Sequence, residues 1–192
     1  MPFTVFHYPI AFGLSKANKR LSLPGLIVGS VLPDIEVPIM WLFFSNLPDH
    51  LVLHSLVGAL TLGTVLAVLV THYIYPMVIS SLFSVEPGYL SEKCQISPLL
   101  VVSCMLGLLS HLLLDYLVHP FNPLLYPWVD PHKLVGPLVQ LFMFSENLSI
   151  GYFISMVLTS VIMLILCGII LFKYKGPDLW NHLWVGHFTQ VE

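Results

Sequence analysis

Four long apolar stretches constrain this chain more than any other feature. They cover residues 23–44, 51–78, 97–118 and 148–172. About 20 apolar residues cross the hydrocarbon core of a bilayer as a helix, and the last three stretches are each long enough. The first is interrupted by Pro33-Asp34-Ile35-Glu36, so it predicts a short helix to Leu32, a break at Pro33 and a second apolar piece. We therefore expect an all-α integral membrane protein.

The composition agrees with this expectation and limits the kinds of partner. Hydrophobic residues make up 57% of the 192-residue chain and charged residues only 9%. A soluble domain is about a quarter charged, so the apolar excess of this chain has to face lipid. The length suits a single membrane domain, residues 1–192. The net charge of −3 gives no indication of a nucleic-acid partner.

A shorter apolar segment, residues 6–17, precedes the first long stretch. The basic segment 16–20 separates the two, and His7 and Asp34 lie at similar distances from it along the chain. If the two arms fold back as a helical hairpin, these two side chains come level with each other. The sequence thus predicts about four transmembrane helices plus an N-terminal helical hairpin.

The basic residues divide unevenly between the expected loops. Six of the seven fall on one side of the membrane if the helices alternate in direction, and Lys133 alone falls on the other. Because basic residues concentrate in cytoplasmic loops, we place segment 16–20, loop 84–96 and the C-terminal tail in the cytoplasm. This topology sends His54, His111 and Asp115 to the outer face.

His111 and Asp115 are the strongest candidates for chemistry. Their spacing of four places them on one face of a helix, in an apolar span where an ionisable group must be paired or bound. Imidazole nitrogen and carboxylate oxygen are ligands that zinc accepts. His119, four residues further along, lies on nearly the same face and is a third candidate. The alternative is a hydrogen-bonded His–Asp pair that joins two helices.

Asp34, Glu36, His54 and His7 are further candidates, each with a structural alternative. Asp34 could instead cap a helix after the break at Pro33, and the two histidines could simply lie at the membrane interface. Glu36 points differently from Asp34, so we expect it either to support a ligand or to act as the general base of catalysis.

Two independent arguments place most of these donors at one membrane level. The hairpin and the charge distribution together place five residues at this level: His7, Asp34, His54, His111 and Asp115. Five nitrogen and oxygen donors at one level predict a site for one or more divalent metals, most simply Zn²⁺. By contrast, we expect His50 to be solvated in a polar loop.

The order of these residues resembles that of a known family. The matching segments are Phe3-Thr4 with His7, then 28–36, 54–58 and 107–115, followed by His119-Pro120 and 123–127. They resemble the membrane-bound metal-dependent hydrolases that include the LexA-binding, inner-membrane-associated hydrolase-like proteins. Leu53 departs from that pattern, in which Thr precedes the central His. The order of donors is also similar to that of soluble zinc-dependent phospholipases C.

The resemblance covers residues 1–127 and implies a metal-site core there. Residues 128–192 remain as a loop, a scaffold transmembrane helix and a C-terminal tail. The resemblance further implies a location in the prokaryotic cytoplasmic (inner) membrane. With the topology above, the site lies toward the outer face of that membrane.

We expect a membrane-bound hydrolase that uses a divalent metal on an amphiphilic substrate, for example a phosphoester. A metal lowers the pKa of bound water toward about 7, and Glu36 could take the remaining proton. Membrane lipid and that substrate are the expected partners, and the oligomeric state stays open. Two alternatives also stay open: a non-catalytic membrane partner in a stress response with a structural metal, and a proton or metal-ion transporter.

Overall fold

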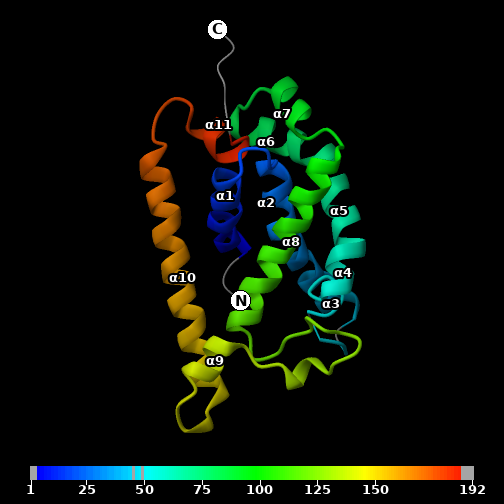
Figure 1. Cartoon of the computed structure of the whole chain (residues 1–192), viewed down its shortest axis with the longest axis vertical. Helices are drawn as coiled ribbons and strands as arrows, with labels where there is room; N and C mark the ends of the chain where they lie inside the picture. Colours follow the sequence, from blue (N-terminus) through cyan, green and yellow to red (C-terminus); the bar gives the residue numbers. More distant parts are fainter. Residues whose placement is uncertain (1–3, 45, 49, 187–192) are drawn as a thin grey trace.

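The computed structural model describes residues 4–44, 46–48 and 50–186, and all regular elements in these ranges are helical (Figure 1). Four helical segments are long and apolar enough to cross a membrane. They are Leu23–Phe43, Leu56–Phe83, Pro98–Val118 and Leu148–Lys173. The expected all-α membrane fold is therefore confirmed. Phe3, one of the residues that carries the resemblance, lies outside the described residues.

The N-terminal segment forms the expected helical hairpin. A 3-10 turn, η1 (Thr4–His7), leads into α1 (Tyr8–Ala17), and the chain then turns into α2 (Leu23–Val31). The Ser22 hydroxyl caps α2 by accepting a hydrogen bond from the Gly25 amide at 3.3 Å. Because α1 packs back along α2, the start of α1 and the end of α2 lie at the same end of the hairpin.

The first spanning segment is broken at Pro33, as the sequence predicts. A 3-10 turn, η2 (Leu32–Ile35), joins α2 to α3 (Glu36–Phe43). Proline has no amide hydrogen and cannot continue the hydrogen-bond ladder of an α-helix. The break places Asp34 in a tight turn at the level where α2 ends.

The second spanning helix begins at Leu56 rather than near residue 51 and ends at Phe83 rather than near residue 78. The later start follows from Glu36, whose carboxylate accepts hydrogen bonds from the amides of residues 51–53 and holds this segment outside the helix. Ser55 then caps the helix at the Gly58 amide. Its parts are α4 (Leu56–Gly58), α5 (Thr64–Leu69) and α6 (Tyr75–Phe83), joined by π-helical segments at Ala59–Gly63 and Val70–Ile74.

The remaining spanning helices are α8 (Pro98–Val118) and α10 (Leu148–Lys173). α10 lies at one edge of the bundle (Figure 1). Only 17% of its most apolar 18-residue stretch is buried, which suits a helix that faces lipid. The short helices and turns are α7 (Pro87–Lys93), η5 (Pro131–Lys133), α9 (Pro137–Leu141), η6 (Phe144–Glu146) and α11 (Leu179–Trp184).

The central contact of the bundle is between α2 and α8. A Cβ atom added to Gly29 would collide with the Cys104 carbonyl, and one added to Gly107 would collide with the Leu26 carbonyl. Small residues at a helix contact within a membrane let the two backbones approach closely. The close approach fixes how the end of α2 lies against the last turns of α8.

Gly107→Ala should therefore destabilise the protein, because the added methyl group overpacks the α2–α8 contact. We expect a loss of about 1–3 kcal/mol, measured as a lower melting temperature in detergent. Gly168→Ala on α10 is the matched control, since a Cβ there meets nothing within 4 Å. Equal melting temperatures for the two variants would contradict the importance of this contact.

Candidate metal centre

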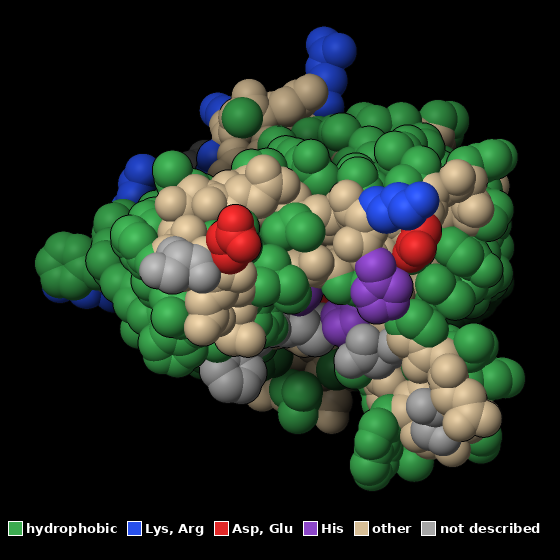
Figure 2. Space-filling view, turned by 90° about the horizontal axis from the view of Figure 1, so that it is seen from below, with side chains coloured by type: hydrophobic (Ala, Val, Ile, Leu, Met, Phe, Trp, Pro, Cys, Tyr) green, Lys and Arg blue, Asp and Glu red, His purple; other side chains and the backbone are tan. Residues whose placement is uncertain are grey.

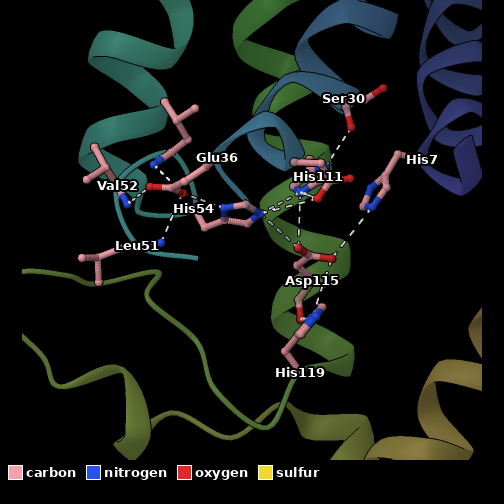
Figure 3. Close-up of polar contacts among 11 residues, drawn as sticks. His7, Ser30, Glu36, Leu51, Val52, His54, His111, Asp115 and His119 are labelled. Atoms are coloured by element: carbon pink, nitrogen blue, oxygen red, sulfur yellow. Dashed lines mark hydrogen bonds and ion pairs between the residues drawn. The ribbon is translucent and has the colours of Figure 1, made fainter. Parts of the chain in front are cut away.

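Four separate parts of the chain bring polar side chains to one point inside the bundle (Figure 3). His7 comes from η1 and Asp34 from η2, while His111 and Asp115 come from the last turns of α8. His54 comes from the segment just before α4. All five side chains are buried, and His111 is fully inaccessible. The structure thus places together the five donors that the sequence puts at one level.

The donor atoms lie within a few ångströms of one another. The Nε2 atoms of His54 and His111 are 3.3 Å apart. The Asp115 Oδ2 atom lies 3.2 Å from His111 Nε2 and 3.6 Å from His54 Nε2. Asp34 Oδ1 lies 3.6 Å and 3.8 Å from the same two nitrogens. On the other side of Asp115, its Oδ1 atom lies 3.8 Å from His7 Nε2.

Hydrogen bonds behind two of the rings determine which nitrogen faces the centre. His111 Nδ1 lies 2.8 Å from the Ser30 carbonyl oxygen and donates to it, because a carbonyl oxygen can only accept. His54 Nδ1 donates to Glu36 Oε2 at 2.9 Å in the same way. In a neutral imidazole protonated at Nδ1, the lone pair is on Nε2. Metal-binding histidines are commonly held in this manner.

Glu36 supports His54, the first of the two roles expected for it, and its position does not favour the role of general base. Its oxygens accept hydrogen bonds from the amides of residues 51–53 at 2.6–3.2 Å in addition to the one from His54. These donors occupy both oxygens. Glu36 also contacts the ring through Nδ1, on the side away from the other donors (Figure 3). A general base needs an oxygen within reach of the reacting water, so Glu36 is a positioning residue.

The donors form two compact groups that share Asp115. Within each group, one potential ligand atom from each residue lies within 4.8 Å of the others. The first group comprises Asp34, His50, His54 and Asp115, and the second comprises His7, His111 and Asp115. The shared carboxylate has one oxygen facing His7 and the other facing His54 and His111.

His50 is a member that the sequence analysis missed. It is buried, and its ring lies against that of His54 with centroids 4.4 Å apart, so the expectation that it is solvated is wrong. The spacing of four between these histidines repeats that of His111 and Asp115. Because residues 51–55 are not helical, however, this spacing does not by itself place the two rings on one side.

His119 belongs to neither group, so its prediction as a metal ligand is not supported by the geometry. Its Nδ1 atom lies 3.1 Å from the Asp115 carbonyl oxygen and 3.7 Å from Asp115 Oδ1. The physical reason is that α8 ends at Val118, and His119 has an extended backbone. The helical face that carries His111 and Asp115 therefore does not continue to this residue.

Burial and nearby charge alter the protonation of the histidines outside the spanning helices. Burial, reinforced by His111, lowers the pKa of His7 to about 3, and burial also lowers the pKa of His119. Both rings are therefore neutral at pH 7. Burial by itself would lower the pKa of His54, but the proximity of Asp34 and Glu36 outweighs it and raises this pKa to about 9. The centre thus attracts positive charge, whether as a proton or as a metal ion.

A proton on His54 does not satisfy the centre, whereas the donor set fits a divalent metal. The four carboxylate oxygens of Asp34 and Asp115 and both nitrogens of His7 are buried with no hydrogen-bond partner among the described residues. Asp34 accordingly does not cap a helix, and unpaired buried polar atoms are costly. Two ligand atoms about 2.05 Å from a tetrahedral zinc ion lie about 3.3 Å apart, which matches the 3.3 Å between the two Nε2 atoms.

Comparison with known proteins gives one match. A family model described as a domain of unknown function, DUF4184, matches residues 1–167. The matched range contains every member of both donor groups. No curated protein and no solved structure matches the chain.

Glu36→Gln should weaken metal binding even though Glu36 lies behind the donors. The amide side chain loses the charge that holds His54, and its NH₂ group cannot accept from the amides of residues 51–53. Loss of such supporting groups lowers metal affinity by roughly 10–100-fold. Metal content after dialysis against a chelator measures the effect, with the exposed Glu86→Gln as control. Full metal retention by Glu36→Gln would contradict the supporting role.

Proposed function

The chain belongs to the DUF4184 family, and we propose that it is a membrane-bound hydrolase that uses a divalent metal, Zn²⁺ by its donor set, on an amphiphilic substrate. One observation carries the proposal. Two histidine Nε2 atoms face each other at 3.3 Å, beside four buried carboxylate oxygens that have no hydrogen-bond partner among the described residues. Such a cluster is costly unless a cation joins its members.

The donor residues would divide the work between binding and orientation. The two donor groups, Asp34, His50, His54 and Asp115 and then His7, His111 and Asp115, would hold one or two metal ions. The metal would supply a Lewis acid and would lower the pKa of bound water toward about 7. Glu36 and the Ser30 carbonyl would keep the two imidazole rings in the required tautomer. With Glu36 fully occupied, a carboxylate of the centre itself is left to accept the proton of the attacking water.

The surroundings of the centre favour hydrolysis over transport. A transporter requires polar groups that continue through the membrane. The buried side chains of α2 and α8 are mainly apolar, among them Leu26, Leu100 and Leu108. The hydroxyls of Ser30 and Ser103 in these helices donate to backbone carbonyls of their own helix. A purely structural metal is the remaining alternative, and only a measurement of turnover separates it from a catalytic metal.

Asp115→Asn should remove metal binding from both groups, since Asp115 is shared. We expect the purified wild-type protein to contain zinc or another divalent metal, and the variant to lose affinity roughly 10-fold or more. Hydrolysis of p-nitrophenyl phosphate should fall with the metal content and return when metal is added back to the chelated wild type. Elemental analysis and the colour of the released nitrophenol give the two readouts.

The control for this experiment is His72→Gln, a histidine at the other end of the molecule whose Nδ1 contacts the Cys94 carbonyl. Helical content and a single peak in size-exclusion chromatography establish that each variant is folded. Absence of metal from the folded wild type would refute the proposal. Metal without hydrolysis would instead favour the structural alternative.

We also propose that the centre faces outward in the prokaryotic cytoplasmic membrane. The turn between α1 and α2 lies at the same end of the bundle as α7 and α11, and the loop that carries Lys133 lies at the opposite end, near α3 and α9 (Figure 1). The end with six of the seven basic residues would be cytoplasmic. Asp115 lies in the last turn of α8, toward the other end.

Labelling of introduced cysteines tests this orientation. Asp130 and Glu92 are both exposed in the fold, so the membrane side alone decides whether a cysteine there can react. In intact cells, a membrane-impermeant maleimide should modify Asp130→Cys and leave Glu92→Cys unmodified. The unsubstituted chain is the control for its three native cysteines, none of which is exposed. Reaction of Glu92→Cys alone would reverse the topology.

A further inference from the structure

An apolar groove leads along the bundle to Asp34. It runs between α2 on one side and the second spanning helix on the other, with a volume of about 540 Å³. Its walls include Ile27 and Val31 from α2, Val70 and Ile79 opposite, and Trp184 at the end away from Asp34. Ligand pockets typically measure about 300–1,000 Å³. The groove is therefore large enough for a ligand, and its one acidic wall residue belongs to the metal centre.

A second pocket opens on the other side of the centre, at the end of the molecule that holds the long loop. It has a volume of about 590 Å³, and its lining includes His50, His119, His132 and Tyr152. Viewed from this end, Figure 2 shows histidine side chains at the surface in a hollow between other groups. A small cavity of about 10 Å³, bounded by His50, His54, Asp115 and His119, lies between this pocket and the centre. That volume is close to what one water molecule needs.

The two openings differ in what they can admit. The groove is formed mainly by apolar side chains of membrane-spanning helices, with Thr4, Asp34, Tyr75 and Trp184 as its other walls, so hydrocarbon is its natural occupant. The histidine-lined pocket also has apolar walls, from Pro48, Pro120 and Phe121, but its three histidines make it the more polar of the two openings and suit it to water and a polar group. His50 belongs both to this pocket and to the first donor group, while Asp34 belongs both to the groove and to that group. The centre therefore lies between a lipid side and a polar side.

On the basis of the proposed function, we propose that the substrate is the phosphate ester of a single-chain lipid alcohol. Its chain lies in the groove between α2 and residues 70–79 of the second spanning helix, and its phosphate lies at Asp34 and Asp115. Two adjacent donor groups that share one carboxylate suit a phosphoryl group, because paired metal ions clamp the attacking and leaving oxygens. The step forms a bond from the water oxygen to phosphorus and breaks the bond from phosphorus to the lipid oxygen. The lipid oxygen gains a proton from the water, and inorganic phosphate leaves through the histidine-lined pocket.

A lipid chain fits the groove better than a helix of a partner protein does. The wall from Ile27 to Asp34 rises about 10 Å along α2. A partner's spanning helix of about 20 residues would be about 30 Å long, so this wall would contact only about a third of it. The centre at one end of the groove also supplies a place for the head group of an amphiphile, which a transmembrane helix does not need.

Filling the groove tests the inference. Val31→Phe and Val70→Phe narrow it from opposite walls, and both side chains are only half-buried, so folding should survive. Val157→Phe on the lipid-facing side of α10 is the matched control. The probes are hexadecyl phosphate, which has a chain, and p-nitrophenyl phosphate, which has none. We expect turnover of hexadecyl phosphate to fall about tenfold or more relative to p-nitrophenyl phosphate in both groove variants, because a displaced chain misplaces the phosphate.

A binding measurement supplies a readout that does not depend on turnover. Hexadecylphosphonic acid with bromine on its chain should quench the fluorescence of Trp184, which lines the groove. The difference in quenching between the wild type and Trp184→Phe is the contribution of Trp184. This contribution should be absent from Val31→Phe and present in Val157→Phe.

The outcomes separate this inference from the proposed function. If p-nitrophenyl phosphate is hydrolysed and the groove variants treat both probes like the wild type, the chain does not occupy the groove, and the inference fails alone. Quenching that is equal in the wild type and Trp184→Phe also shows that the groove does not hold the chain. If the metal-loaded wild type hydrolyses neither probe, the proposed hydrolase function fails as well.

Discussion

The close approach of α2 and α8 is the contact on which the rest of the site depends. Gly29 and Gly107 permit it, and it brings the Ser30 carbonyl to within 2.8 Å of His111 Nδ1. Lipid provides no hydrophobic force that drives helices together, so such a contact relies on van der Waals packing. Asp34 lies in the turn that follows α2, and Asp115 lies in the last turn of α8, so this contact also sets where the two carboxylates lie. The spacing of the carboxylates is therefore set by backbone packing rather than by flexible side chains.

A second constraint comes from placing Glu36 inside an apolar segment. The amides of residues 51–53 lie outside a helix and therefore have no intrahelical acceptor. Glu36 provides these acceptors, and the same carboxylate holds His54 by its Nδ1 atom. One buried acid thus ends a loop, delays the start of the second spanning helix to Leu56 and orients the His54 ring.

The centre lies where two different environments meet. An apolar groove reaches it along the spanning helices at Asp34, and a histidine-lined pocket reaches it at His50 from the end of the bundle that holds the long loop. Enzymes that act on amphiphiles need access of this kind, because the chain cannot leave lipid cheaply and the polar products cannot enter it. The helices of the bundle are rigid elements, which suits donors that must keep fixed distances.

The sequence by itself determined the spanning helices, the N-terminal hairpin and the pairing of His111 with Asp115. These features depend on local hydropathy, on the basic turn and on the helical repeat, all of which a single segment carries. The tertiary structure alone decided the roles of Glu36, His50 and His119. Each role depends on where a helix starts or stops: the loop before Leu56 turns His50 inward and gives Glu36 its amides, and the end of α8 at Val118 leaves His119 beside Asp115 but outside both donor groups. Helix ends follow from long-range hydrogen bonds, such as those of Glu36 to residues 51–53, and no local pattern specifies them.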